Sequence, residues 1–432
     1  MFIGRENELL KLNKLYNKND FEFCVFYGRR RVGKTTLINE FCRDKKVIYF
    51  VGVEATAKEN LENLSKAIFE AVHPNAPFAV FDNFERAIEY VFECSKQERI
   101  IFVIDEYPYL AECYKPISSI IQKHIDQQHT SSKLFLILCG SSMSFMENQV
   151  LGYKSPLYGR RTAQFKILPF TYFETARMLP GFTNEEKAVI YGATGGIPEY
   201  LSRIDQNLSL KENIVELFFT TSGRLFEEPS NLLKQELREP LTYNSIISAI
   251  AGGASKLNQI ATKVGIETSQ CSNLLNILIS LGLVKKNTPV TEKVSRKTIY
   301  VLEDQMFRFW YRFVASNMNS IVSGFGEKVY EKIVVEGIST YMGLVFEEIC
   351  KQYLLEQLKL DKLPFFFEDI GKWWGNNKKE KREEEIDIMA ISDHKVIFAE
   401  CKWTNAPVGL EILNDLTARS QLFHYGEIYF YI

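Results

Sequence analysis

The sequence predicts an α/β protein of several domains: a parallel sheet near the N-terminus, a helical region, a winged helix-turn-helix and a second, smaller α/β domain. Between residues 21 and 170, nearly continuous apolar runs alternate with helical patterns, as expected for parallel strands that are covered on both faces. The chain has 432 residues, more than one ordinary hydrophobic core accommodates, so roughly two to four domains are expected. Three of the four tryptophans lie after residue 343, where the composition changes.

The composition and charge of the chain exclude several classes of protein. The formal net charge is −2, so a site for nucleic acid has to be a local patch of charge. No apolar run approaches the roughly 18 residues that span a membrane, and the first residues lack the basic and apolar regions of a signal peptide. The eight cysteines form no C-x-x-C pair, and the five histidines show no ligand spacing. We therefore expect a cytoplasmic protein with reduced thiols, without a membrane partner and without zinc.

Five strands are expected in the N-terminal region, after an amphipathic helix at Glu6–Tyr16. Their expected bounds are Phe21–Tyr27, Val47–Val53, Ile100–Asp105, Leu134–Gly140 and Ala163–Leu168. Together with the helical patterns between them, these strands form the core domain that we assign to residues 1–170.

The stretch GRRRVGKTT follows the first strand and precedes a helix-compatible run, Thr35–Phe41. It matches G-x-x-x-x-G-K-[ST], in which glycines let backbone N–H groups surround a phosphate and the helix N-terminus adds its dipole. We expect Lys34 to contact the β- and γ-phosphate oxygens of a nucleotide and Thr35 to bind Mg²⁺. A chance match in a surface turn is the alternative, which the flanking strand and helix argue against. The residues expected to bind the nucleotide here are Gly28, Arg29, Arg30, Arg31, Val32, Gly33, Lys34, Thr35 and Thr36.

Two later strands end in further candidate residues. The third strand, in IIFVIDEYPYL, delivers Asp105, which would hold Mg²⁺ through water, and Glu106, which would act as the base for an attacking water. An acidic pair that only caps the strand end is the alternative. The fourth strand, in LFLILCGSSMSF, ends at Ser141 and Ser142. We expect Ser141 to sense the γ-phosphate, although a serine here could also cap a helix.

The segment SPLYGRRT carries Arg160 and Arg161, which are candidate arginine fingers for the transferred phosphoryl group. They could equally be surface basic residues. If either acts in trans, the protein must self-associate. Residues 171–236 are rich in helical patterns and contain TGGIPEYL, in which two glycines end one helix and Pro198 begins the next.

Residues 237–315 are expected to form a winged helix. The three expected helices are Asn244–Ala251, Ser255–Gly265 and Thr268–Val284. The wing, residues 285–302, carries basic side chains suited to phosphate contacts: Lys285, Lys286, Lys293, Arg296 and Lys297. The third helix has no Arg or Lys, so a role in protein or interdomain contacts stays open beside DNA binding.

A buried helix is expected at the aromatic run Met306–Val314, and a helical linker at residues 316–342. Residues 343–432 then form the smaller α/β domain. It contains an amphipathic helix in GLVFEEICKQYL, a charged loop at residues 376–384, and strands in EIDIMAIS and VIFAECKW.

Charged side chains on these two strands and on the helix could form a metal site. Residues i and i+2 of a strand share a face, so Glu400 and Lys402 point the same way, and Asp387 on the adjacent strand can join them. Carboxylates hold Mg²⁺ through oxygen atoms and a lysine can activate water, with Glu347 as a further ligand. The alternative is a half-buried sheet whose charged residues face solvent.

Together these motifs resemble those of the archaeal-type ATPases, which are STAND-like and AAA+-like P-loop proteins with a C-terminal PD-(D/E)xK domain of restriction-endonuclease-like fold. The segments that carry the resemblance are FIGRENEL, GRRRVGKTT, FVIDEYPYL, LCGSS, SPLYGRR, GGIPEYL, FRFWYRFV, GLVFEEIC, WWG, EIDIMAI and AECKW.

The resemblance implies that the nucleotide is ATP, that FIGRENEL borders its base, and that residues 171–236 form a helical lid whose Pro198 packs near it. It also implies a nuclease-like C-terminal domain, although Ile386 stands where the nuclease motif has proline. Similar chains continue for another strand and helix after the equivalent of EIYFYI, which leads to the hypothesis that residues 343–432 are truncated.

The expected function is Mg²⁺-dependent binding and hydrolysis of ATP that drives a conformational switch and controls a nuclease-like domain acting on DNA. The expected catalytic residues are Glu106, Lys34, Arg160, Asp387, Glu400 and Lys402. The expected metal ligands are Thr35, Asp105, Glu347, Asp387 and Glu400. The alternative is an ATP-dependent regulatory or scaffold protein whose winged helix and C-terminal domain bind DNA or protein without cleavage.

Overall fold

The computed structural model describes residues 2–74, 78–292, 297–377 and 380–432. The chain folds into two compact units, residues 1–169 and 170–432. The first unit contains a five-stranded sheet, and the second contains a four-stranded sheet and a two-stranded ribbon.

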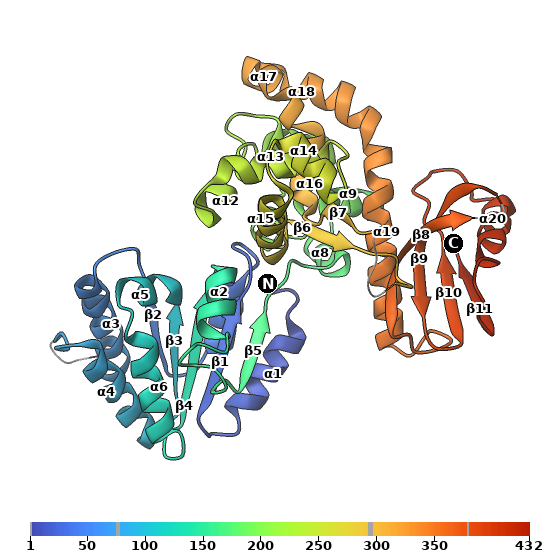
Figure 1. The fold of residues 1–432 in the computed structure, drawn as a ribbon. Coiled ribbons are helices and arrows are strands. Elements are labelled where there is room, and N and C mark those ends of the chain that lie inside the picture. The colour runs from blue at the N-terminus through green and yellow to red at the C-terminus, as the bar shows by residue number, and fades with distance from the viewer. Residues whose placement is uncertain (1, 75–77, 293–296, 378–379) are drawn as a thin grey trace. The chain divides into compact units, whose positions relative to one another are not determined.

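The first unit is built around a parallel five-stranded sheet in the order β2-β3-β4-β1-β5 (Figure 1). The strands are β1 (Glu22–Tyr27), β2 (Val47–Val51), β3 (Ile100–Asp105), β4 (Leu134–Gly140) and β5 (Ala163–Lys166). Every residue of β1, β3 and β4 is buried, which explains their continuous apolar sequences. The predicted parallel α/β sheet is confirmed, although β1, β2 and β5 are shorter than predicted.

Helices connect these strands and pack against the sheet (Figure 1). They are α1 (Glu6–Tyr16), α2 (Lys34–Cys42), α3 (Ala57–Val72), α4 (Phe84–Gln97), α5 (Tyr107–Cys113), α6 (Ile117–Gln128), α7 (Met143–Phe145) and a π-helical turn at Met146–Val150. Because the five strands run in one direction, the segments that follow β1, β3 and β4 meet at the carboxyl edge of the sheet.

The second unit begins with five helices: α8 (Tyr172–Met178), α9 (Asn184–Thr194), α10 (Pro198–Leu201), α11 (Leu210–Phe218) and α12 (Glu228–Glu236). Capping boxes at Thr171, Thr183 and Ser209 fix the start of α8, α9 and α11. Gly195 is left-handed and ends α9, and Pro198 is the first residue of α10, as the sequence predicts.

Three helices and a two-stranded antiparallel ribbon follow: α13 (Pro240–Ala251), α14 (Leu257–Val264), α15 (Thr268–Ser280), β6 (Val284–Asn287) and β7 (Ile299–Leu302). Helix α15 is shorter than predicted because Gly282 takes a left-handed conformation (φ 68°). The N–H group of Leu283 then donates to the carbonyl oxygen of Leu278 (3.0 Å), which ends the helix. Lys293 and Arg296 of the predicted wing lie outside the described residues.

The predicted buried helix is α16 (Gln305–Phe313), whose buried residues include Met306, Phe307, Phe309, Trp310 and Phe313. Short elements then cover residues 315–334: a 3₁₀ turn at Ala315–Asn317, α17 (Met318–Ser320), α18 (Gly326–Val329) and π-helical turns at Ile321–Phe325 and Tyr330–Val334.

The 25-residue helix α19 (Val335–Lys359) runs through the border that we placed between residues 342 and 343. The linker and the C-terminal domain are therefore joined by one continuous helix. Despite its length, α19 is not apolar enough to span a bilayer, and neither is any other helix in the described part of the chain.

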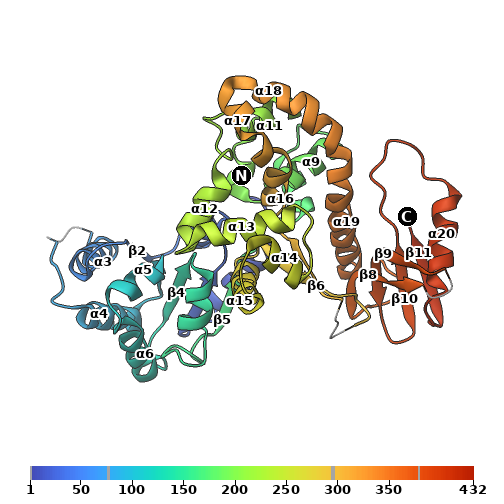
Figure 2. The same ribbon diagram turned by 45° about the horizontal axis from the view of Figure 1, so that its top comes forward.

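A four-stranded mixed sheet follows α19 (Figure 2). Its strand order is β11-β10-β9-β8. Its elements are β8 (Asp369–Asn377), β9 (Arg382–Ile391), β10 (Lys395–Ala399), α20 (Leu410–Ser420) and β11 (Glu427–Tyr431). Strands β8, β9 and β10 are antiparallel in succession, whereas β11 is parallel to β10.

The sequence prediction did not include β8 or α20. Gly371 and Gly375 interrupt the alternation that would mark β8 as a strand, while Trp373 anchors it in a core with Ile386 and Phe398. Because β8 extends to Asn377 and β9 begins at Arg382, the predicted charged loop is reduced to a short connection. Two of its residues, 378 and 379, lie outside the described part of the chain.

Two helical glycines of the second unit differ in the space that surrounds them. A Cβ at Gly326 would collide with the carbonyl oxygen of Phe219, whereas a Cβ at Gly343 would meet open space. We expect Gly326→Ala to destabilise the unit by roughly 1–3 kcal/mol through overpacking. As the matched control, Gly343→Ala should stabilise it by roughly 0.5–1 kcal/mol because alanine restricts the unfolded chain.

Tryptophan fluorescence during denaturant unfolding would measure this difference, since all four tryptophans lie in the second unit. Equal unfolding midpoints for the two variants would contradict the close approach of Gly326 to Phe219.

Candidate functional site

The phosphate loop connects the end of β1 at Tyr27 to the start of α2 at Lys34. Two glycines shape it. Gly28 has φ 153°, and a Cβ there would collide with the carbonyl oxygen of Ile167. Gly33, with φ 88°, is the left-handed residue immediately before α2. The sequence motif therefore corresponds to a backbone turn that needs glycine at both positions.

The ammonium group of Lys34 lies inside this loop. Its Nζ donates to the carbonyl oxygens of Gly28 (2.8 Å) and Arg29 (2.9 Å), and the residue is 7% exposed. A phosphate held by the loop would meet this charge and the N-terminus of α2 at once. Within the loop, Nη2 of Arg30 donates to the hydroxyl of Tyr109 (3.1 Å).

Asp105, at the end of β3, lies next to the start of α2. Its Oδ2 accepts hydrogen bonds from Oγ1 of Thr35 (2.9 Å) and from the hydroxyl of Tyr49 (2.8 Å). A carboxylate and a hydroxyl at this separation fit Mg²⁺, which is commonly bound by one or two protein oxygens together with substrate phosphates and water. Burial, and then Asp105, raise the pKa of Tyr49, so the tyrosine stays a hydrogen-bond donor.

Glu106 is held in an unusual backbone conformation beside Asp105. Its φ is 48°, a left-handed value that is uncommon for glutamate. The carboxylate accepts from Oγ of Ser141 at both oxygens (2.9 and 2.8 Å), and the Ser141 N–H group lies 3.3 Å away. Glu106 and Ser141, predicted from separate strands, are therefore direct neighbours. Ser142 immediately precedes α7.

Sequence reasoning missed two residues of this site. Arg5, within FIGRENEL, is 7% exposed, and its Nη2 donates to the carbonyl oxygens of Val32 (3.2 Å) and Leu168. Tyr49 binds Asp105 from the middle of β2. The resemblance pointed to the segment around Arg5 but not to this contact. Tyr49 was missed because its sequence context is that of an ordinary strand residue.

Arg160 does not reach the phosphate loop of its own chain. Its guanidinium forms a bidentate ion pair with Asp126 near the end of α6 (2.7 Å for both hydrogen bonds). Nearby, the N–H group of Thr162 donates to the carbonyl oxygen of Phe23 (2.8 Å), close to the start of β1. The loop follows the opposite end of β1, so the position of Arg160 and its neighbour Arg161 does not suit a finger acting in the same chain.

Pro198 lies in the second unit, at the start of α10. The segment around it is anchored by Glu228, which is fully buried and accepts from the hydroxyl of Tyr200 (2.7 Å) and from Nη1 of Arg224 (3.0 Å). Such partners offset the cost of burying a carboxylate. The turn that carries Pro198 is therefore held rigidly within its own unit.

Glu347 and Asp387 both lie within 4 Å of Lys372, and the charge of Glu400 acts on Asp387. We call Glu347, Asp387 and Glu400 the carboxylate cluster. Oε1 of Glu400 accepts from Nζ of Lys402 (2.7 Å), and Oδ2 of Asp387 accepts from the N–H group of Cys401 (2.9 Å). One detail of the prediction is wrong: β10 ends at Ala399, so Glu400 and Lys402 follow the strand rather than belong to it.

A lysine that the sequence analysis missed sits among these acids. Nζ of Lys372, on β8, is 3.3 Å from Oε2 of Glu347, 3.4 Å from Oε2 of Glu385 and 3.8 Å from Oδ1 of Asp387. Burial raises the pKa of Glu347 and of Asp387, while Lys372 opposes that rise. Lys372 escaped notice because β8 itself was not predicted.

Each member of the carboxylate cluster therefore faces a cation of the protein. Glu347 and Asp387 face Lys372, and Glu400 pairs with Lys402 and with Nη2 of Arg419 (3.0 Å). The oxygen donors are of the kind that Mg²⁺ prefers. In the part of the chain that the structure describes, however, no group of three or more acidic, histidine or cysteine side chains is arranged to hold a metal ion.

The ribbon of the predicted wing makes contacts within its own unit. Nζ of Lys285 is 3.7 Å from Oε2 of Glu348 on α19, and Lys297 pairs with Glu292 (2.7 Å). The N–H group of Val290 donates to the carbonyl oxygen of Lys372 (3.0 Å). Two of the predicted phosphate-binding lysines are thus paired with carboxylates.

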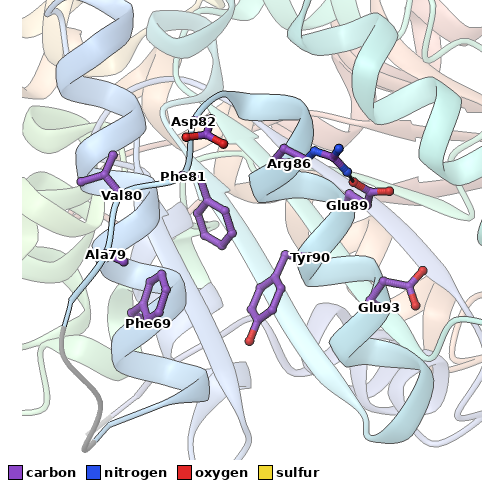
Figure 3. Close-up of a pocket in the computed structure, with 9 residues that line it drawn as sticks. All are labelled: Phe69, Ala79, Val80, Phe81, Asp82, Arg86, Glu89, Tyr90 and Glu93. Carbon is purple, nitrogen blue, oxygen red and sulfur yellow. Dashed lines mark hydrogen bonds and ion pairs between the residues drawn. The ribbon is translucent and has the colours of Figure 1, made fainter.

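A pocket of about 460 Å³ lies elsewhere in the first unit, between α3 and α4 (Figure 3). Phe69, Phe81 and Tyr90 line it, and Arg86 pairs there with Glu89 (2.7 Å). Its lining residues do not include any member of the phosphate loop.

Two cysteines adjoin the carboxylate cluster. Interaction with the neighbouring Cys401 thiol lowers the pKa of Cys350. The other seven cysteines have raised pKa values.

We expect iodoacetamide at about pH 7.5 to modify Cys350 first, because its thiolate fraction is the largest. Peptide mass spectrometry over a time course would show the order. Cys401→Ala should slow the reaction, whereas Cys401→Ser, which keeps a donor, should slow it less, and Cys94→Ala should leave it unchanged. A faster reaction at any other cysteine would contradict this expectation.

Comparison with known proteins agrees with the geometry of the phosphate loop. A family model described as an ATPase domain predominantly from Archaea matches residues 2–204, and a model described as archaeal and bacterial proteins of unknown function matches residues 310–416. Among solved structures, the Walker-type ATPase PABY2304 of Pyrococcus abyssi is 19% identical and has a TM-score of 0.56. That alignment covers 72% of this chain and 96% of the other, so the fold is shared.

Two relatives come from Methanocaldococcus jannaschii. The "Uncharacterized ATP-binding protein MJ0423" is 47% identical over 47 residues, which are 11% of this chain and 80% of that protein. The "Uncharacterized protein MJECL04" is 36% identical over 427 residues, which are 98% of this chain and 92% of that protein. With this match over nearly the full length and the phosphate loop in place, the chain belongs to the family of proteins that carry the ATPase domain found predominantly in Archaea.

Proposed function

We propose that this protein binds ATP with Mg²⁺ at the phosphate loop, hydrolyses it, and uses the nucleotide state to control its C-terminal domain. One observation carries the proposal of hydrolysis. Thr35 and Asp105 are in contact, Glu106 follows Asp105 directly, and the Lys34 ammonium lies inside the loop that precedes Thr35. These contacts support a metal-binding pair and a base at this site. Membership of the ATPase family supports the same conclusion.

Each residue of the loop region has a distinct role in this proposal. Lys34 would exchange the carbonyl oxygens of its own loop for phosphate oxygens. Mg²⁺, held by Thr35 and Asp105, would neutralise charge on the phosphates. Glu106 would accept a proton from the attacking water. Ser141 would sense the γ-phosphate by turning its hydroxyl from Glu106 to a phosphate oxygen.

We expect Lys34→Ala to lose ATP binding, because the charge that faces the phosphates is gone. Glu106→Gln should keep ATP binding while hydrolysis falls roughly 10²–10⁴-fold, since an amide cannot accept the proton. Equilibrium binding of labelled ATP and steady-state phosphate release would separate the two effects. Lys58→Ala, on the exposed side of α3, is the matched control, and undiminished ATP binding by Lys34→Ala would refute the proposal.

We further infer that residues 171–236 act as a lid, 237–315 as a winged helix and 343–432 as a nuclease-like domain. The element order α19-β8-β9-β10-α20-β11, with three antiparallel strands and a final parallel one, supports the last assignment. In this proposal Asp387, Glu400 and Glu347 would bind Mg²⁺. Lys402, held 2.7 Å from Glu400, would activate water for attack on a DNA phosphodiester.

A second function is favoured by the contacts of the ribbon. Lys285 and Lys297 are paired with acids, and Val290 bonds to β8, so the ribbon engages its own protein rather than presenting a free basic surface. This supports an ATP-dependent regulatory protein whose winged helix and C-terminal domain bind DNA or protein without cleavage. Arg160 or Arg161 could then act in trans, in an assembly of several chains.

Plasmid incubated with the full chain, Mg²⁺ and ATP distinguishes these two functions. The nuclease proposal expects cleavage that disappears in Asp387→Ala and Lys402→Ala but persists in Asp393→Ala, an exposed control between β9 and β10. Intact plasmid in every sample, with a gel shift that weakens as salt increases, would instead support binding without cleavage.

A further inference from the structure

Lys372 is held from two sides. Its side chain lies among Glu347, Glu385 and Asp387, and its carbonyl oxygen accepts from the N–H group of Val290. Lys372 therefore connects the segment that follows β6, through Val290, to the carboxylate cluster.

The β-sheet pairing explains how the lysine reaches the acids. Gly371 pairs with Met389 and Trp373 pairs with Ile386, so Lys372 alone faces two residues of β9, Asp387 and Ile388. This is a β-bulge, a distortion that changes the direction of side chains and is frequent beside functional sites. Trp373 is buried in the core on one side of Lys372, which limits movement of the strand.

An ammonium group and a divalent cation compete for the same carboxylate oxygens. Mg²⁺ requires ligand distances of about 2.0–2.1 Å and close to octahedral geometry. Nζ of Lys372 lies within 4 Å of both Glu347 and Asp387, so its positive charge opposes the entry of a second cation between them. Glu400 is neutralised separately by Lys402 and Arg419.

We propose that Lys372 is an internal cation that closes the carboxylate cluster to divalent metal ions, and that the bond from Val290 holds it there. The inference rests on the cation site proposed above for Glu347, Asp387 and Glu400. A metal ion could enter once the ribbon releases the backbone of Lys372 and the side chain leaves the acids. The ribbon would then control the C-terminal site through this backbone hydrogen bond.

The ribbon itself offers a precise way to break that bond. The Glu292 N–H group donates to the carbonyl oxygen of Pro289 (2.8 Å), which makes residues 289–292 a β-turn with Val290 at its second position. Proline is favoured at this position of a turn and lacks an N–H group. Val290→Pro should therefore keep the turn and remove the donor, while Val290→Ala keeps both.

The test is Mn²⁺ binding to the full chain without nucleotide, measured by electron paramagnetic resonance of free Mn²⁺. We expect Lys372→Met to bind Mn²⁺ at least about tenfold more tightly than the wild type, because a charge is removed from between the carboxylates. The gain should vanish in the double variant Lys372→Met/Asp387→Asn. Lys372→Arg, which keeps the charge, should behave as the wild type does.

Val290→Pro should give a smaller gain than Lys372→Met, and Val290→Ala none. If Lys372→Met folds, as judged by tryptophan fluorescence, and binds Mn²⁺ no better than the wild type, the inference is wrong. If it does not fold, the comparison of Val290→Pro with Val290→Ala decides, and equal Mn²⁺ affinities would overturn the proposal.

Failure of the proposed nuclease function gives a different pattern. Tighter Mn²⁺ binding by Lys372→Met with plasmid left intact would sustain the role of Lys372 and refute cleavage. Cleavage by the wild type without a gain in Mn²⁺ affinity in Lys372→Met would refute only the role of Lys372.

Discussion

The nucleotide site depends on how closely the backbone of Gly28 approaches that of Ile167. No side chain fits between them, so the end of β1 and the segment after β5 can lie this near only with glycine at position 28. This approach places the start of the phosphate loop, and the left-handed Gly33 places its end, so that α2 begins at Lys34. Asp105 arrives at the same edge because β3 runs parallel to β1, with β4 between them.

The two acidic sites of the chain hold their carboxylates by different means. Asp105 accepts hydrogen bonds from neutral hydroxyl groups, those of Thr35 and Tyr49, which orient the carboxylate without cancelling its charge. The carboxylates of the C-terminal cluster instead face ammonium and guanidinium groups. A carboxylate bound by neutral donors keeps its attraction for a metal ion, whereas one bound by a cation must first lose that partner.

Much of the fold could be predicted because fully buried strands have continuous apolar sequences. The fully buried strands β3 and β4 were predicted with their observed bounds, and the spacing from Gly28 to Thr35 defined the loop. The contacts of Arg5, Tyr49 and Ser141 could not be predicted, because each joins segments that lie far apart in the chain. Lys372 was missed for another reason: its glycine-containing strand lacks regular alternation, and its position depends on a bulge.

Arg5 connects the phosphate loop to the segment after β5 through hydrogen bonds of its side chain. One guanidinium nitrogen of this residue bonds to Val32 in the phosphate loop and to Leu168, two residues before the second unit begins at Phe170. The phosphate loop and the segment that leads out of the first unit therefore share one hydrogen-bond donor.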